Sequence, residues 1–175
     1  MLAPVADAYV RGGTFASTNF GTDGTLVVKQ SPTDASNTRQ TYLRFDLSAV
    51  NSISSAKLRL FGGLTNGTGA VTVAVTAVPS TTWVEGNGGT DNNPAGEIRD
   101  ANKPAASGAA LATRSVTSTA AGWYEWDLTA FLQAQKAAGK NLVSVVLTAT
   151  AATDSAVVFN SRDAGANRPS LVVTA

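Results

Sequence analysis

The sequence predicts an all-β protein, a β-sandwich of two antiparallel sheets with one short helix, and three observations support this fold class. Apolar and polar residues alternate with period two in several short segments, as in strands with one buried face. Val and Thr are frequent and suit a pleated surface, whereas Gly, Asn, Asp and Ser suit the tight turns between strands. The segments also follow one another at the spacing typical of a sandwich.

Alternation is clearest in residues 42–47, where the odd positions are apolar. Tyr42, Arg44 and Asp46 therefore share the opposite, outward face of this predicted strand. Lys29 ends another predicted strand nearer the N-terminus. The remaining strands are predicted at 56–60, 71–76, 142–150, 156–160 and 171–174.

Residues 129–138 break this pattern because they are mostly good helix formers. Asp127 or Thr129 can cap the start of this short helix, and Gly139 can end it. Residues 85–108 are rich in Gly, Asn and Pro, which predicts a long ordered loop.

Length and composition restrict the class of protein. A chain of 175 residues suffices for one domain, and no repeat or linker divides it, so we expect a single domain over residues 1–175.

The absence of Cys and His removes thiolate chemistry, the commonest general base and the commonest zinc ligand. A net charge of +1 argues against a general nucleic-acid binder, and no apolar run approaches the roughly 20 residues of a membrane span. The first residues lack the pattern of a signal peptide, so we expect a part of a secreted protein whose signal has been removed.

Short motifs follow one another in a specific order along the whole chain. They include Asp-Ala-Tyr-Val-Arg-Gly-Gly at 7–13, Tyr-Leu-Arg-Phe-Asp-Leu at 42–47 and Ser-Arg-Asp at 161–163. The other matching positions are 19–21, 26–29, 39, 57–60, 82–85, 93–94, 126–129 and 168–171. Together these motifs resemble the DNRLRE-type domains, which include carbohydrate-binding modules attached to alginate lyases and other polysaccharide-degrading enzymes. The sequence departs from that pattern at Asp163, where Glu is expected, and in lacking a Trp before Asn102.

The resemblance implies a jelly-roll β-sandwich from a secreted bacterial protein. It also implies a non-catalytic module that binds an acidic (uronate) polysaccharide, alginate first, and holds an attached catalytic domain on that polymer. In members that bind alginate, a basic platform lies near the N-terminal strands, at positions that match Arg11, Lys29 and Arg39 here.

The residue types agree with an acidic ligand. Arg meets a carboxylate with two parallel hydrogen bonds, and Lys supplies a point charge. Neighbouring strands lie about 4.8 Å apart, so cations on adjacent strands form a ladder with roughly the spacing of sugar units. The candidate ligand-binding residues are Arg11, Lys29, Arg39, Arg44, Tyr42 and Arg162. Each of these charges can instead be a solvated residue paired with an Asp, and Arg162 can form an internal ion pair.

Other functions stay open at this point. A lyase of uronate polymers would use Tyr or Lys to take a proton beside an Arg, and a cell-surface adhesion or spacer module would have no sugar site. Aromatic stacking on Trp123 would favour neutral sugars. We expect no catalytic residues, and the carboxylate pair Glu125 and Asp127 fits two outward residues of one strand better than the acid and base of a glycosidase.

We expect no required cofactor. A structural Ca²⁺ is compatible with Asp residues on sandwich loops, but the sequence contains no Asp-x-Asp-x-Asp loop, and the metal ligands stay unassigned.

Overall fold

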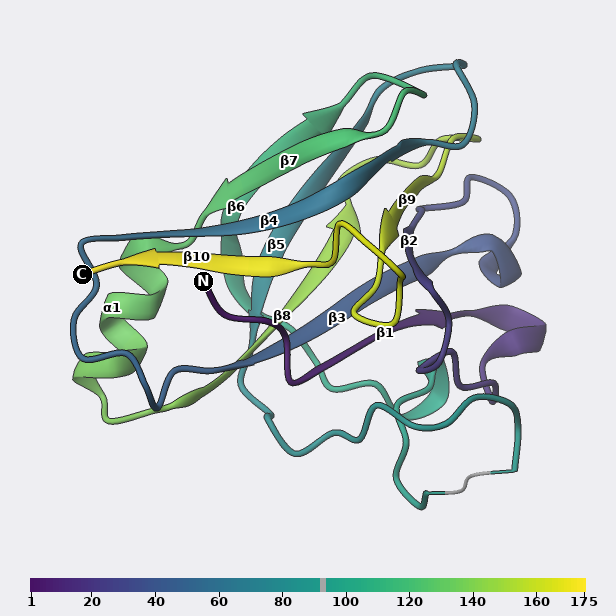
Figure 1. Cartoon of the computed structure of the whole chain (residues 1–175). Coiled ribbons are helices and arrows are strands. Elements are labelled where there is room, and N and C mark those ends of the chain that lie inside the picture. Colours follow the sequence, from purple (N-terminus) through teal and green to yellow (C-terminus); the bar gives the residue numbers. More distant parts are fainter. Residues whose placement is uncertain (92–93) are drawn as a thin grey trace.

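The computed structural model describes residues 1–91 and 94–175, so Asn93 of the motif at 93–94 lies outside the described residues. Two five-stranded sheets form a sandwich, and within the described chain one α-helix lies at one end of it (Figure 1). The strands within each sheet pair antiparallel. The predicted all-β sandwich with one short helix is therefore confirmed.

The first sheet has the strand order β1-β3-β8-β5-β6. Its strands are β1 (Ala6–Arg11), β3 (Arg39–Asp46), β8 (Leu142–Ala149), β5 (Val71–Val78) and β6 (Ser107–Val116). The second sheet has the order β10-β4-β9-β2, and β7 pairs with β4 as well. Its strands are β10 (Ser170–Thr174), β4 (Ser55–Leu64), β9 (Val157–Asn160), β2 (Thr25–Val28) and β7 (Gly122–Asp127).

Strand β6 was not expected from the sequence. Its residues are mostly small or polar and mostly exposed, because β6 is the outer strand of its sheet. An edge strand of this kind has no alternation of apolar and polar residues from which to predict it.

The main core fills the space between the sheets with the inward residues of both. Leu43 and Phe45 of β3 are at most 2% exposed, which confirms the predicted face of that strand. Trp126 of β7 lies in the same core, where its indole nitrogen donates to the carbonyl of Val73 at 3.1 Å. Its ring meets Phe159 edge-on, with ring centres 5.8 Å apart.

A second apolar cluster lies on the outer face of the first sheet. The loop between β5 and β6, described over 79–91 and 94–106, covers this face with Trp83 and Ile98. Trp83 anchors the loop because its indole nitrogen donates to the Ser144 hydroxyl at 3.1 Å. The predicted long loop therefore forms part of the packing of the sheet. The cluster consists of Ala6, Ala8, Val10, Tyr42, Val78, Trp83, Ile98 and Val146.

The helix α1 (Thr129–Ala137) forms where it was predicted. The Asp127 carboxylate accepts a hydrogen bond from the Thr129 backbone N–H at 2.8 Å, which satisfies one donor of the first turn. Leu132 is buried in the main core, and Gly139 follows the helix with φ +71°, a conformation that favours glycine. Among the described residues, no helix has the length and apolar character needed to cross a membrane.

Candidate functional site

Arg11, Arg39 and Lys29 are backbone neighbours on three strands. Arg11, the last residue of β1, lies directly opposite Arg39, the first residue of β3. Lys29 directly follows β2, and its backbone N–H and C=O exchange hydrogen bonds of 3.0 and 2.8 Å with Arg39. This exchange joins the end of β2 to the start of β3, so both sheets contribute to one group of cations. We call Arg11, Lys29 and Arg39 the basic cluster.

Neutral groups hold the two arginines of the basic cluster. The Arg11 Nε donates to the Ser36 carbonyl at 2.6 Å, and its Nη2 lies 3.4 Å from the Asn37 side-chain oxygen. The Arg11 guanidinium also lies 3.6 Å from the centre of the Phe15 ring, a cation–π contact. Arg39 donates from one Nη to the Asn37 carbonyl at 3.1 Å. A guanidinium has five N–H donors, so these contacts leave donors on both side chains for a ligand.

The basic cluster has no acidic partner within the described chain. The Lys29 ammonium donates to a backbone carbonyl, that of Asp154, at 3.0 Å. None of the ion pairs among residues 1–91 and 94–175 includes Arg11, Lys29 or Arg39. Partial burial, and then the charge of Arg11, lower the pKa of the Arg39 guanidinium below its usual value. The cluster is therefore a half-buried group of cations without a direct ion-pair partner among the described residues.

Arg44 and Tyr42 lie on the other face of β3. Successive side chains of a strand point to alternate faces of the sheet. Arg39 and Arg44 are separated by an odd number of positions in β3, so they point to opposite faces. Arg44 donates from Nη1 to the carbonyls of Thr81 and Trp83 at 2.9 and 2.5 Å and thereby holds the long loop. The expectation that Arg44 shares one platform with Arg11 and Arg39 is therefore wrong.

Tyr42 points to the outer face of its sheet, as the alternation in residues 42–47 predicted, but the long loop covers it. Its side chain is 2% exposed in the second apolar cluster, and its hydroxyl donates to the Pro104 carbonyl at 3.0 Å. The sequence pattern defined the face of the strand but gave no sign that a loop buries it.

Arg162 lies outside the basic cluster and forms the internal ion pair that was the alternative interpretation. Its Nη1 is 3.3 Å from a Glu85 carboxylate oxygen and donates to the Val5 carbonyl at 2.6 Å. Its backbone N–H donates to Asp7 at 2.8 Å. These contacts join the turn after β9 to the first strand and to the long loop.

An exposed aromatic surface lies on the second sheet. Trp123 of β7 is 40% exposed, and its ring lies edge-on to Phe61 with centres 5.3 Å apart. The Arg59 guanidinium lies 4.6 Å from the centre of the Trp123 ring, and Glu125 forms ion pairs with Arg59 and Lys57. Trp123 therefore faces outward, and the nearby cations of β4 are already paired with Glu125.

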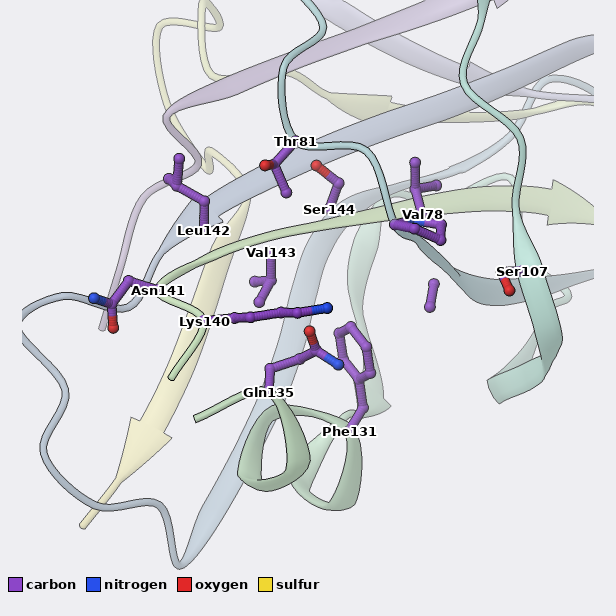
Figure 2. Close-up of a pocket in the computed structure, with 12 residues that line it drawn as sticks. Val78, Thr81, Ser107, Phe131, Gln135, Lys140, Asn141, Leu142, Val143 and Ser144 are labelled. Atoms are coloured by element: carbon purple, nitrogen blue, oxygen red, sulfur yellow. The ribbon is translucent and has the colours of Figure 1, made fainter. Parts of the chain in front are cut away.

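A hollow of about 540 Å³ lies beside α1, at the end of β3 opposite to Arg39. Figure 2 shows Phe131 and Gln135 of α1 and the side chain of Lys140 directed into this hollow. Lys140 is the only cationic residue among those that line it. One charge in a hollow lined also by Val78 and Val143 is a weaker match to a polyanion than the basic cluster.

A comparison with known families decides the class of the protein. The sequence profile of carbohydrate-binding module family 96 matches residues 1–175. The chain belongs to this family. It is also similar to a gellan lyase from a Bacillus species, with 33% identity over 140 residues. That alignment covers 77% of this chain but 5% of the length of the gellan lyase, so the module corresponds to a small part of the relative. The carbohydrate-binding class predicted from the motifs is thus confirmed.

The residues that position Arg11 were missed by sequence reasoning. Phe15 belongs to the short helix η1 (Gly13–Phe15), and Ser36 and Asn37 belong to η2 (Ala35–Asn37). The hydroxyl of Ser36 accepts a hydrogen bond from the Thr14 backbone N–H at 3.1 Å, which connects the two segments. No local pattern reveals this contact, because it depends on the loop after β2 returning to the end of β1.

Proposed function

We propose that this module binds an acidic polysaccharide, alginate first, through Arg11, Lys29 and Arg39. The observation that carries the proposal is the absence of any carboxylate partner for these three adjacent cations within the described chain. Like charges directly opposite one another across two strands destabilise a sheet, so this arrangement costs free energy that a bound polyanion would recover.

The chemistry of the basic cluster suits a row of carboxylates. Arg11 and Arg39 can each offer parallel donors to a carboxylate, while Lys29 offers a mobile point charge. Single exposed pairs contribute roughly 0.2–1 kcal/mol, so useful affinity needs several contacts along one polymer. Half-burial of these side chains strengthens each contact, because salt and water screen it less than on an open surface.

The similarity to part of a gellan lyase supports an acidic ligand and makes gellan the second candidate. It also supports a module that acts beside a catalytic domain in a longer protein. We place that protein outside the cell, because polysaccharides of this size occur and are degraded there.

We propose further that the module itself is not catalytic. In the alternative lyase, a phenolate would take a proton near the arginines, and Tyr9 is the nearest candidate. Burial, and then the charge of Asp23, raise the pKa of Tyr9 above its usual value, and its hydroxyl already donates to Asp23 at 3.0 Å. Burial likewise raises the pKa of Tyr42, which the long loop covers. Both phenols are thus held in the protonated form that cannot act as a base.

Affinity electrophoresis through gels that contain alginate, gellan or a neutral glucan tests the proposal. We expect retardation by alginate or gellan, none by the glucan, and weaker retardation of Arg11→Ala, Lys29→Ala and Arg39→Ala. Trp123→Ala is the control: it removes the exposed aromatic ring of the second sheet and should migrate like the native chain. Retardation that is unchanged in all three cluster variants, or equal retardation by the glucan, would exclude this site.

The same chain tests the catalytic alternative. Prolonged incubation with alginate should give no rise in the absorbance of unsaturated uronates. A rise that disappears in Tyr9→Phe would establish a lyase instead of a binding module.

A further inference from the structure

Three carboxylates from distant parts of the chain meet beside the first strand. Asp7 belongs to β1, Glu85 to the long loop, and Asp163 to the turn after β9. One ligand oxygen from each lies within 4.8 Å of the others. Two oxygens bound to the same Ca²⁺ are at most about 5 Å apart, because Ca–O distances are 2.3–2.6 Å. The three side chains therefore already have the separation of ligands around one ion.

The second observation is a buried carboxylate oxygen without a donor. Asp7 is 1% exposed, and its Oδ2 accepts a hydrogen bond from the Arg162 backbone N–H at 2.8 Å. Its Oδ1 is buried and has no hydrogen-bond partner in the described residues. Leaving a charged oxygen in this state costs several kcal/mol in general, so native proteins pair such groups or use them as metal ligands.

The charges around this oxygen do not balance. The cluster brings three carboxylates together, while Arg162 supplies the one guanidinium that pairs with Glu85, at 3.3 Å. The Arg44 guanidinium also acts on Glu85, so three carboxylates face two guanidinium groups and an excess of negative charge remains.

We propose that Asp7, Glu85 and Asp163 bind one Ca²⁺ that joins β1 to the long loop and to the turn after β9. Oxygen ligands alone select a hard cation, and an irregular set from three separate segments suits Ca²⁺ better than the strict octahedron of Mg²⁺. Asp163 is exposed and lines a surface hollow, so water can complete the coordination there.

The ion would act at a junction that direct contacts already hold in part. The backbone N–H of Asp7 donates to Glu85 at 2.9 Å across 78 positions of sequence, on the edge of β1 that pairs with no other strand of the described chain. Asn19 adds to this junction by donating to the carbonyls of Glu85 and Ile98 at 2.7 and 2.8 Å. A bound cation would hold the same junction through the carboxylate oxygens of Asp7, Glu85 and Asp163.

Thermal unfolding and calorimetric titration of the full chain, first stripped with EDTA, test this site. With Ca²⁺ at a hundredfold excess over its Kd, we expect Tm to rise by about 5–10 °C and the titration to show one site per chain. Mg²⁺ at the same concentration should give a much smaller shift. Asp163→Asn removes an exposed ligand and should abolish both effects, and Asp7→Asn should do the same if it folds.

Asp91→Asn is the control, because Asp91 is exposed and takes part in none of the ion pairs of the described chain. It should respond to Ca²⁺ like the native chain. No Tm shift and no titration heat in the native chain would overturn the proposal, and so would a full response in Asp163→Asn. An equal shift with Mg²⁺ would contradict the assignment to calcium.

Discussion

Arg11 and Arg39 lie directly opposite each other on β1 and β3, and their nearest polar contacts are the neutral groups of Ser36 and Asn37. Cross-strand neighbours usually carry opposite charges or none, because like charges in this position repel. Lys29, directly after β2, adds a third positive charge through its isolated bridge to Arg39. This arrangement is poor for stability alone and suited to a polyanion.

The first prediction separates stability from binding at Arg39. Arg39→Gln removes the repulsion with Arg11, which is worth about 0.2–1 kcal/mol, so the free energy of unfolding should stay unchanged or rise. Binding to alginate should weaken at the same time. Urea denaturation and affinity electrophoresis of one preparation measure both quantities. A clear loss of stability would indicate that Arg39 is a structural residue.

The second prediction concerns ionic strength. The screening length falls from near 8 Å at 0.15 M to about 3 Å at 1 M salt, so the affinity for an acidic polymer should fall strongly over this range. Stacking on Trp123 would instead survive the salt. Titrations at four salt concentrations measure the slope. An affinity that does not change with salt would assign binding to an aromatic surface.

The third prediction concerns Arg44, which sequence reasoning had grouped with the basic cluster. Arg44→Ala leaves the carbonyls of Thr81 and Trp83 without their donor, so we expect the protein to lose about 1–3 kcal/mol of stability. Affinity for alginate should remain near the native value in the folded protein. Arg114→Ala, at an exposed position of β6, should cost less than about 0.5 kcal/mol and serves as the control. Loss of binding without loss of stability in Arg44→Ala would return Arg44 to the ligand site.

The case of Arg44 shows which parts of the structure could be predicted. Period-two alternation identified β3 and its core face, because burial of Leu43 and Phe45 is encoded locally. The same pattern could not show that the long loop covers Tyr42, since that depends on Trp83 packing from 41 positions away. The alternation could not show that Arg11 lies opposite Arg39 either, because register is set by the pairing of β1 with β3; only the family resemblance grouped these two residues.

The fourth prediction concerns pH in the presence of a chelator. Burial raises the pKa of Asp7 to about 7 in the folded state, above its value of 3.8 when unfolded. The folded chain then binds more protons than the unfolded chain between about pH 4 and 7, so stability falls as pH rises through this window. The loss should approach about 4 kcal/mol, since one pKa unit corresponds to about 1.4 kcal/mol.

Urea denaturation from pH 4.5 to 8 in EDTA measures this effect, and Asp7→Asn is the matched control. The variant has no carboxyl to titrate at this position, so its stability should change much less over the same range. An identical slope in both proteins would show that other groups cause the pH dependence.

The most direct test of the central claim compares two double variants of equal net charge. Arg11→Gln/Arg39→Gln removes two cations from the basic cluster, and Arg114→Gln/Lys140→Gln removes two exposed cations elsewhere, so each changes the net charge from +1 to −1. Calorimetric titration with alginate at 0.15 M salt should show about tenfold weaker binding for the first variant and binding within about twofold of native for the second. Equal losses in both variants would mean that overall charge alone attracts the polymer, and would contradict a site at Arg11, Lys29 and Arg39.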